Sequence, residues 1–382
     1  KTIVLAVTGS IAAYKIANLA SMLKKLHADV QVLMTRNATN FINPITFETL
    51  TANKCLIDTF DRNFVHQVEH ISLAQRTDLV IIAPATANVC AKLAHGLADD
   101  MLTTTVLACK CPKLIAPAMN TNMYENPVTQ DNLQILRKYG WQVITPASGR
   151  LACGAVGAGK LPEPEELVQY VLRRIGKTHD LQGKKALVTD GPTQESLDPV
   201  RYLTNHSTGK MGYAIAENCM RRGAEVTLVT GPVSIAPPPF VKVIHTESAQ
   251  DMFDAVTSLS DEQDIIIKSA AVADYRPAAV SDQKIKKQGD GHLVLTLKQT
   301  PDVAAAVGKM KKDGQVLIGT PCIGKSGSVV VTGGNRQNGA GLGNALVDRI
   351  QQLAVGQNIA GGKATGGAKA HVDHISTQLQ GI

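Results

Sequence analysis

Short apolar runs alternate with amphipathic segments along the first half of the chain. The runs consist of β-favouring residues and are bounded by proline or glycine, as buried parallel strands commonly are. The segments between them carry apolar residues at three- and four-residue spacing, which predicts helices such as one over 12–26. The predicted strands are 2–8, 29–34, 79–83, 113–116 and 142–144. This succession predicts a doubly wound α/β domain.

The same alternation begins again after a polar stretch. Residues 173–185 are polar and charged, and they separate the last helix of the first half from a new strand at 185–189. Further strands are predicted at 225–230, 241–245 and 264–268, and helices near Gly209 and over 248–258. We therefore predict two Rossmann-like doubly wound domains, with a first domain at 1–175, a linker at 176–184 and a second domain at 185–382.

The end of the second domain departs from this pattern. Glycine is dense after Gly319, and no aromatic residue follows Tyr275. Only 345–354 has a helical pattern. So long a stretch without periodicity is unusual in a compact domain, and we treat 320–382 as atypical.

Composition narrows the class of protein. The net charge is +7, but the basic residues are scattered and the chain has a single tryptophan. This argues against nucleic-acid binding and favours small anionic substrates. Seven cysteines without framework spacing indicate reduced thiols. With no membrane-length apolar run and no signal-peptide pattern, we expect a cytoplasmic protein that does not bind membranes.

Polar turns follow four of the strands predicted in the first half. Backbone N–H groups and the helix dipole favour an anion at such turns, and small side chains let a flat ring approach the backbone. Taken alone, Gly9-Ser10 is more typical of a helix cap. Together the turns predict a ligand site at the carboxyl edge of the sheet. They are Gly9-Ser10, Thr35, Thr86-Ala87-Asn88 and the segment Pro-Ala-Met-Asn-Thr-Asn-Met-Tyr at 117–124.

Some candidate residues are ambiguous on their own. His70 lies at the head of a predicted helix, where a capping or packing role is the simpler interpretation. Cys153 lies in a glycine-rich loop that can place a thiol against a ligand, although a lone cysteine is usually inert. Cys109 and Cys111 resemble half a metal site, but no second pair follows at ligand spacing.

Considered together and in order, these motifs resemble a known family. The first half resembles the flavin-dependent cysteine decarboxylases, and the whole chain resembles the bacterial bifunctional phosphopantothenoylcysteine decarboxylase/phosphopantothenate–cysteine ligases of coenzyme A synthesis. The motifs are Gly-Ser-Ile-Ala-Ala-Tyr-Lys at 9–15, His70, Pro-Ala-Thr-Ala-Asn at 84–88, Ala-Asp-Asp at 98–100, Pro-x-Met-Asn-x-x-Met at 117–123, and the Cys153 loop.

The resemblance implies a flavodoxin-like flavoprotein domain in the first half. It implies that the flavin oxidises the cysteinyl thiol to a thioaldehyde, the electron sink that lets CO2 leave. By motif, His70 is the base near the substrate, Asn120 holds the departing carboxylate and Cys153 delivers the proton. The implied FMN-binding residues are Gly9, Ser10, Ile11, Thr35, Thr86, Ala87, Asn88 and Ala118.

Two motifs of the second half admit two interpretations from the residues alone. The loop from Asn205 to Gly212 suits a phosphate or acyl phosphate, although a capped helix after a loop is equally consistent. Lys284-Ile285-Lys286-Lys287 gathers charge suited to a triphosphate, although lysines also suit an exposed edge strand.

The resemblance implies a ligase that uses CTP and Mg²⁺ to convert 4'-phosphopantothenate into an acyl-cytidylate, from which cysteine displaces CMP. Asn205 would stabilise the acyl-cytidylate or the step that consumes it, with Arg201 near the phosphorylated substrate. The metal ligands stay unknown. The family has a phenylalanine where this chain has Thr320, and its later lysine-rich helix is absent. The implied nucleotide positions are Lys268, Ser269, Ala270, Ala271, Asp274, Lys284, Pro301, Asp302, Val303 and Ala304.

The main hypothesis is a bifunctional enzyme in which the ligase product feeds the decarboxylase and 4'-phosphopantetheine results. The resemblance implies a homo-oligomer, a trimer-based dodecamer with dimeric ligase domains. One alternative is a decarboxylase with an inactive ligase half. Another is a flavin-binding regulatory or scaffold subunit, against which the presence of His70, Asn120 and Cys153 argues.

Overall fold

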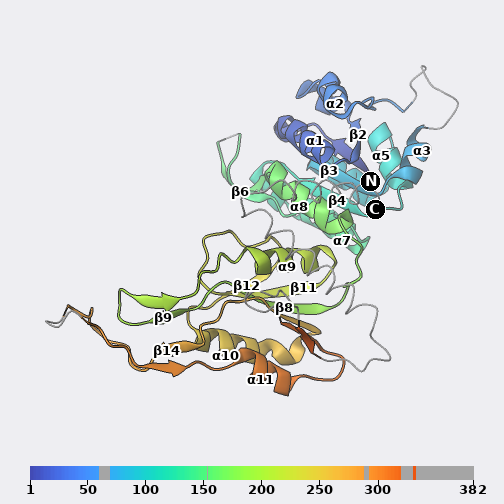
Figure 1. The fold of residues 1–382 in the computed structure, drawn as a ribbon. Helices are drawn as coiled ribbons and strands as arrows, with labels where there is room; N and C mark the ends of the chain where they lie inside the picture. Colours follow the sequence, from blue (N-terminus) through green and yellow to red (C-terminus); the bar gives the residue numbers. More distant parts are fainter. Residues whose placement is uncertain (60–68, 153, 288–291, 320–329, 333–382) are drawn as a thin grey trace, which may run out of the picture. The chain divides into compact units, whose positions relative to one another are not determined.

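The computed structural model describes residues 1–59, 69–152, 154–287 and 292–319, and the backbone of 330–332. The chain divides into two compact units, Lys1–Thr178 and His179–Ile382 (Figure 1). Cys153 and the helix predicted at 345–354 lie outside the described residues. The assignment of one activity to 1–175 and another to 185–382 stays a prediction.

The first unit contains a five-stranded parallel sheet in the order β2-β1-β3-β4-β5. This is the flavodoxin-like strand order, and it confirms the predicted doubly wound fold. All seven residues of β3 are buried, because helices cover both faces of the sheet and demand a continuous apolar run. The strands are β1 (Thr2–Val7), β2 (Asp29–Met34), β3 (Leu79–Ala85), β4 (Lys113–Pro117) and β5 (Gln142–Val143).

Two buried clusters hold the helices of this unit against the sheet. One cluster packs α1, α2 and α8 on one face, and the other packs α3, α4, α5 and α7 on the opposite face. The helix predicted over 12–26 begins as a 3₁₀ turn, in which the Ala13 N–H donates to the Ser10 carbonyl. The helical elements are η1 (Ile11–Lys15), α1 (Ile16–Lys25), η2 (Arg36–Asn40), α2 (Pro44–Thr51), α3 (Glu69–Arg76), α4 (Ala87–Ala94), α5 (Met101–Ala108), α6 (Thr121–Glu125), α7 (Pro127–Lys138) and α8 (Pro164–Ile175).

The second unit contains a six-stranded sheet in the order β12-β11-β8-β13-β16-β17. Numbered within this sheet, this is the Rossmann order 3-2-1-4-5-6, with β17 antiparallel to β16. The predicted strands agree with it to within about a residue at each end. The strands are β8 (Lys185–Asp190), β11 (Glu225–Thr230), β12 (Lys242–His245), β13 (Ile265–Lys268), β16 (Val316–Gly319) and β17 (Val330–Thr332).

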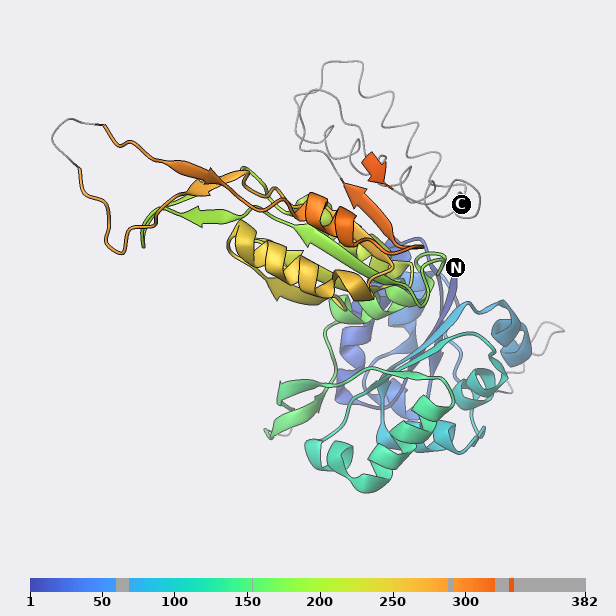
Figure 2. The same cartoon turned by 90° about the horizontal axis from the view of Figure 1, so that it is seen from below.

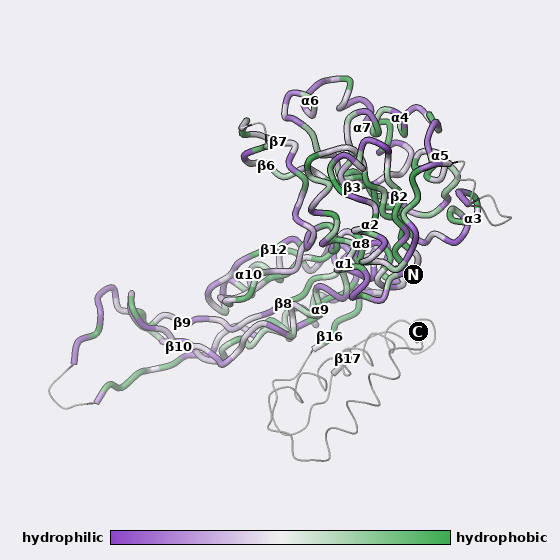
Figure 3. Tube along the Cα trace, turned by 90° about the horizontal axis from the view of Figure 1, so that it is seen from above, coloured by the Kyte–Doolittle hydropathy of each residue, from purple (hydrophilic) through white to green (hydrophobic). Residues whose placement is uncertain are grey.

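Helices again cover both faces of the second sheet. α9 (Lys210–Arg221) packs on one face, and α10 (Ala249–Leu259) and α11 (Val303–Met310) pack on the other. A 3₁₀ turn, η3 (Ser260–Glu262), follows α10. Hydrophobic colour concentrates on buried strands such as β2 and β3 of the first unit, whereas the segment around α6 is largely hydrophilic (Figure 3).

Three antiparallel strand pairs lie outside these sheets in the part of the chain that the structure describes. In the first unit β6 (Ala147–Arg150) pairs with β7 (Val156–Lys160). In the second unit β9 (Gln194–Ser196) pairs with β10 (Tyr202–Thr204), and β14 (Tyr275–Pro277) with β15 (Leu297–Gln299); the latter two extend together away from the sheet (Figure 2). The sequence pattern predicted none of them. No helix among the described residues has the length and apolarity of a bilayer span.

Candidate active sites

A buried threonine joins two loops at the carboxyl edge of the first sheet. Thr8, at the end of β1, donates its hydroxyl to the Pro84 carbonyl at 2.6 Å and accepts the Thr86 N–H at 3.1 Å. The hydroxyls of Thr35 and Thr86 then cap η2 and α4. These bonds fix the loops that follow three neighbouring parallel strands.

A cavity of about 990 Å³ opens at this edge. A side chain at Gly9 would place Cβ 2.7 Å from the Cβ of Asn37, so only glycine permits the loops after β1 and β2 to approach so closely. Of the predicted flavin-binding residues, the ones that line the cavity are Gly9, Thr35, Thr86, Ala87 and Asn88.

The remaining predicted flavin-binding residues do not line that cavity. Ser10 caps η1 by accepting the Ala12 N–H, and the side chain of Ile11 is exposed. Ala118 is buried and donates its N–H to the Ala85 carbonyl at 2.9 Å. The structure therefore brings Ser10 and Ala118 to the same sheet edge, but not to the cavity wall.

Charged pairs line the rim of the first cavity. Arg36 pairs with Asp58 at 2.7 Å, and Lys92 pairs with Asp99 at 2.7 Å. The Lys92 ammonium, by its hydrogen bond, holds the pKa of Asp99 below its ordinary value. Hydroxyls, an amide and helix N-termini beside a glycine-only approach suit a planar group that carries a phosphate. The residues present fit a flavin nucleotide.

The loop that carries Asn120 is packed against the β6–β7 hairpin. The Met119 N–H donates to the Gly159 carbonyl at 3.1 Å, and any Cβ on Gly159, whose φ is +124°, would lie 2.3 Å from the Met119 carbonyl oxygen. A Cβ on Gly157 would come within 2.8 Å of the Thr121 side chain. The two glycines allow the hairpin to pack this closely against the loop.

The predicted catalytic residues of the first unit are placed as follows. Asn120 is the N-cap of α6, and its Oδ1 accepts the Asn122 N–H at 2.9 Å. His70 is half-buried in the first turn of α3 and does not line the 990 Å³ cavity. Cys153 belongs to the chain between β6 and β7 but lies outside the described residues.

The second unit repeats the threonine bridge. Thr189, near the end of β8, accepts the N–H groups of Ser269 at 3.2 Å and Ala270 at 3.3 Å. Thr193 accepts the Ala273 N–H at 3.0 Å. The loops after β8 and β13 are thereby joined at the point where the strand order reverses, which is where open α/β sheets bind ligands.

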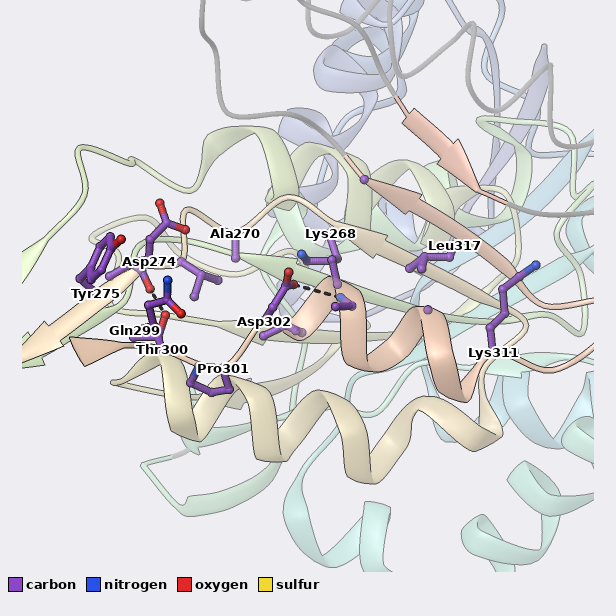
Figure 4. Close-up of a pocket in the computed structure, with 17 residues that line it drawn as sticks. Lys268, Ala270, Asp274, Tyr275, Gln299, Thr300, Pro301, Asp302, Lys311 and Leu317 are labelled. Carbon is purple, nitrogen blue, oxygen red and sulfur yellow. Dashed lines mark hydrogen bonds between the residues drawn. The ribbon is translucent and has the colours of Figure 1, made fainter.

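A cavity of about 1060 Å³ lies beside the loop after β13 (Figure 4). Tyr275 and Gln299 lie at one end and Lys311 at the other. Asp302 caps α11 by accepting the Ala305 N–H at 3.0 Å, so the start of that helix forms part of the wall. Of the predicted nucleotide positions, those that line the cavity are Lys268, Ala270, Asp274, Pro301, Asp302, Val303 and Ala304.

The other predicted ligase residues lie around this cavity. The Asn205 amide donates to the Ala271 carbonyl at 3.0 Å, which places the two together on adjoining loops. The Ser269 hydroxyl oxygen is buried and has no partner among the described residues. A buried polar atom left in this state is consistent with a bound ligand that supplies the missing hydrogen bond. Lys284 is exposed and does not line the cavity.

Arg201 is held by the protein itself. Its guanidinium donates to the buried carboxylate of Asp198 and, at 2.6 Å, to the Ile285 carbonyl. Asp198 also accepts the N–H groups of Val200, Arg201 and Ile285, at 2.9, 2.9 and 3.0 Å. The Arg201 guanidinium and these N–H groups keep the pKa of Asp198 well below its ordinary value. Asp198 therefore anchors the segment that presents Lys284.

Sequence reasoning missed three residues of these sites. Asp198 lies three residues before Arg201, but its anchoring role depends on a contact with distant Ile285. Asp190 is buried at the end of β8, where its Oδ1 accepts the Gly212 N–H at 3.1 Å and its Oδ2 has no partner among the described residues. Burial raises the pKa of Asp190 to about 7. Lys311 gave no signal beyond a basic residue after a helix.

Residues 1–176 match the Flavoprotein family, and residues 181–322 match the DNA/pantothenate metabolism flavoprotein C-terminal domain. The fold and cavity of the first unit, with this match, define a flavoprotein. Curated relatives match across both units. One, named Coenzyme A biosynthesis bifunctional protein CoaBC, from Bacillus subtilis (strain 168), is 44% identical over 359 residues, 90% of this chain and 88% of the relative. This chain belongs to that family of bifunctional proteins.

A second relative of the same name, from Escherichia coli (strain K12), is 43% identical over 321 residues, 84% of this chain and 79% of the relative. Among solved structures, a mutant phosphopantothenoylcysteine (PPC) decarboxylase complexed with pantothenoylaminoethenethiol is 31% identical. That alignment covers 44% of this chain and 95% of the other, with a TM-score of 0.41.

Proposed function

We propose that the chain carries two consecutive activities of coenzyme A biosynthesis. The second unit joins 4'-phosphopantothenate to cysteine at the expense of CTP, and the first unit decarboxylates the product to 4'-phosphopantetheine with FMN. The observation that carries this proposal is the 44% identity to a bifunctional relative over 359 residues, a match that includes both units. It favours neither an inactive ligase half nor a scaffold role.

In the first unit we assign the flavin to the cavity walled by Gly9, Thr35, Thr86 and Asn88. A bound flavin supplies a two-electron oxidation of the cysteinyl thiol, which creates the electron sink that loss of CO2 requires. The assigned roles of the side chains are those of the family motif. Asn120 holds the carboxylate by its amide N–H, His70 accepts a proton and Cys153 returns one at the end of the cycle.

In the second unit we assign the nucleotide to the cavity beside α11. The Lys268 and Lys311 side chains bring positive charge to a wall that also contains the first residues of that helix, a combination suited to phosphates. The carboxylate of 4'-phosphopantothenate would attack the α-phosphorus and release pyrophosphate. The cysteine amine would then displace CMP, with the Asn205 amide, held by Ala271, positioned on the acyl-cytidylate.

Mg²⁺ enters this proposal through the nucleotide. The described residues contain no cluster of three His, Cys, Asp or Glu side chains that could hold a metal alone. Mg²⁺ is commonly bound by one or two carboxylates together with substrate phosphates, and Asp274 and Asp302 line the cavity. The two carboxylates would fit such a site. The trimer-based dodecamer, the dimeric ligase domains and the cytoplasmic location stay predictions from the sequence.

The test uses the purified full chain. Flavin absorbance, pyrophosphate release that requires CTP and 4'-phosphopantothenate, and CO2 release from 4'-phosphopantothenoylcysteine are measured separately. We expect all three. A colourless protein that binds no added FMN would refute the first activity, and a chain that releases CO2 but never pyrophosphate would leave only a decarboxylase.

A further inference from the structure

Two cysteines separated by one residue lie at the edge of the first sheet away from the flavin cavity. Cys109 follows α5, and Cys111 precedes β4, whose opposite end carries the Asn120 loop. Cys109 is buried, as are Cys55, Cys90 and Cys219. Among the free cysteines that the structure describes, only Cys111 is partly exposed to solvent. A buried thiol therefore stands beside an accessible one.

The surroundings of the pair make the two sulfurs unequal. The Cys109 side chain is hydrogen-bonded to that of Cys111, and this bond, together with the Lys113 ammonium, lowers the pKa of Cys111 to about 7. Lys113 is fixed there because its Nζ donates to the carbonyls of Cys109 at 2.6 Å and Cys111 at 3.4 Å. The nearby Asp78 carboxylate acts in the opposite direction on Cys111.

The same hydrogen bond and burial raise the pKa of Cys109. An accessible thiol of lowered pKa next to a buried one of raised pKa is the arrangement of an attacking and a resolving cysteine. The side-chain hydrogen bond keeps the two sulfurs within reach of each other, and the chain, extended at Cys109, bends at Cys111.

We propose that Cys109 and Cys111 form a redox-active dithiol that small disulfides, such as oxidised glutathione, convert to an internal disulfide. The Cys111 thiolate attacks one sulfur of the small disulfide, forms a mixed disulfide and expels one thiolate. Cys109 then attacks the Cys111 sulfur and expels the second thiolate, and the two released thiolates take up the proton that Cys109 loses and the one that Cys111 gave to solvent when it ionised. Two protein thiols are oxidised and one small disulfide is reduced to two thiols.

A tryptophan beside Lys113 can report the redox state of this pair by its fluorescence. The Lys113 ammonium lies 5.8 Å from the ring centroid of Trp141, the only tryptophan in the sequence. Lys113 and Trp141 also line a cavity of about 500 Å³ together with His95 and Tyr139. Because oxidation removes the thiolate that faces Lys113, the fluorescence of Trp141 should respond to the redox state of the pair.

The experiment treats the reduced full chain with oxidised glutathione at pH 7 and digests it with trypsin without reduction. Cleavage after Lys110 separates the two cysteines, so the tripeptide 111–113 stays attached to fragment 93–110 only through a Cys109–Cys111 disulfide. We expect this linked pair, its release by dithiothreitol, and a reversible change in tryptophan emission. Any adduct on Cys153 falls on the separate fragment 151–160.

Two variants assign the roles. Cys109→Ser should stop at a glutathione adduct on Cys111, whereas Cys111→Ser should form neither adduct nor disulfide at this site. Alkylation of Cys111 in the wild type should have its midpoint near pH 7, below the ordinary value of about 8.5. A lasting glutathione adduct on wild-type Cys111, or no reaction there while other thiols react, would overturn the proposal. Neither outcome bears on CO2 or pyrophosphate release.

Discussion

Both units use a threonine to join two loops at the carboxyl edge of the sheet, and the residue that follows this threonine differs between them. In each, a threonine near the end of the unit's first strand bridges to the loop after a neighbouring strand: Thr8 to 84–86 and Thr189 to 269–270. In the first unit the next residue is Gly9, and the chain turns directly into a helix. In the second unit it is Asp190, whose carboxyl accepts the Gly212 N–H in the first turn of α9.

The two cavities differ at this position, since Gly9 lines the first and Asp190 does not line the second. Without a side chain at Gly9, the first cavity extends to the loop after β1 and to the start of α4. In the second unit a buried carboxyl occupies the first turn of α9, and the cavity is walled instead by the loop after β13 and the start of α11. In both units the open helix N-terminus is that of a helix between the strand beside the unit's first strand and the next strand of the sheet, and such an N-terminus favours an anion.

The largest difference between the two activities is expected from His70→Asn. Loss of the proton acceptor should reduce CO2 release by about a thousandfold, within the range of general acid–base contributions, and leave flavin absorbance and pyrophosphate release unchanged. His27→Asn is the control, because His27 is exposed and has a positive φ that asparagine tolerates. Undiminished CO2 release would remove His70 from the mechanism.

The counterpart in the second unit is Asn205→Asp. A carboxylate cannot donate to the Ala271 carbonyl and repels an anionic acyl-cytidylate, so amide formation should fall by about a hundredfold. Pyrophosphate should still appear in the first turnover, and the acyl-cytidylate should accumulate. Asn205→Ala, which keeps the site uncharged, separates the missing donor from the added charge. Normal amide formation in both variants would exclude the assigned role.

A smaller, pH-dependent effect is expected from Asp190→Asn. The folded-state pKa of about 7 exceeds the ordinary 3.8, so the folded state retains a proton that the unfolded state releases. The stabilisation is complete below pH 4 and is lost as the pH rises to 7, by a few kcal/mol at most. Urea unfolding of the second unit at pH 5 and pH 8 measures it. The variant should lack this part of the pH dependence; identical slopes in both proteins would show that Asp190 ionises freely.

The smallest effects come from the matched pair Thr8→Val and Thr189→Val. Each removes the hydroxyl partner of a part-buried backbone N–H, that of Thr86 in the first unit and that of Ala270 in the second, and should cost about 1–2 kcal/mol. The first should weaken flavin binding only, and the second should raise the KM for CTP only. The effects should add in the double variant, since the two bridges share no partner. A change in flavin affinity caused by Thr189→Val would contradict the independence of the two sites.

The strands and the main helices could be predicted from the sequence because burial on both faces requires continuous apolar runs. Ile265–Lys268 and Leu79–Ala85 are of this kind. The hairpin β9–β10 could not, because its stability depends on a distant partner: buried Glu195 accepts the Ala249 N–H of α10 at 2.8 Å. The edge-strand interpretation of 284–287 was wrong, since Asp198 holds Ile285 in an irregular segment.

The site residues divide in the same way, into those that the sequence identified and those that it did not. Thr86 was found because sheet topology brings the loops after neighbouring parallel strands to one edge, whereas Ala270 was found through the family resemblance. Asp190 was missed, since a carboxyl at a strand end gives no sign in the sequence of whether it is buried. For Arg201 the residue type was misleading in the other direction. An arginine suggests an anionic substrate, whereas the Arg201 guanidinium binds Asp198 of the protein itself.

The Thr8 hydroxyl binds the backbone of Pro84 and Thr86, which lie 76 and 78 positions further along the chain. During synthesis, the amino-terminal strand and helix can form as soon as they leave the ribosome, but this bridge must wait until Thr86 has emerged. Cofactor loading of a nascent chain should therefore lag the synthesis of Thr8 by several seconds, the time needed to add the 78 residues up to Thr86 at about 5–20 residues per second.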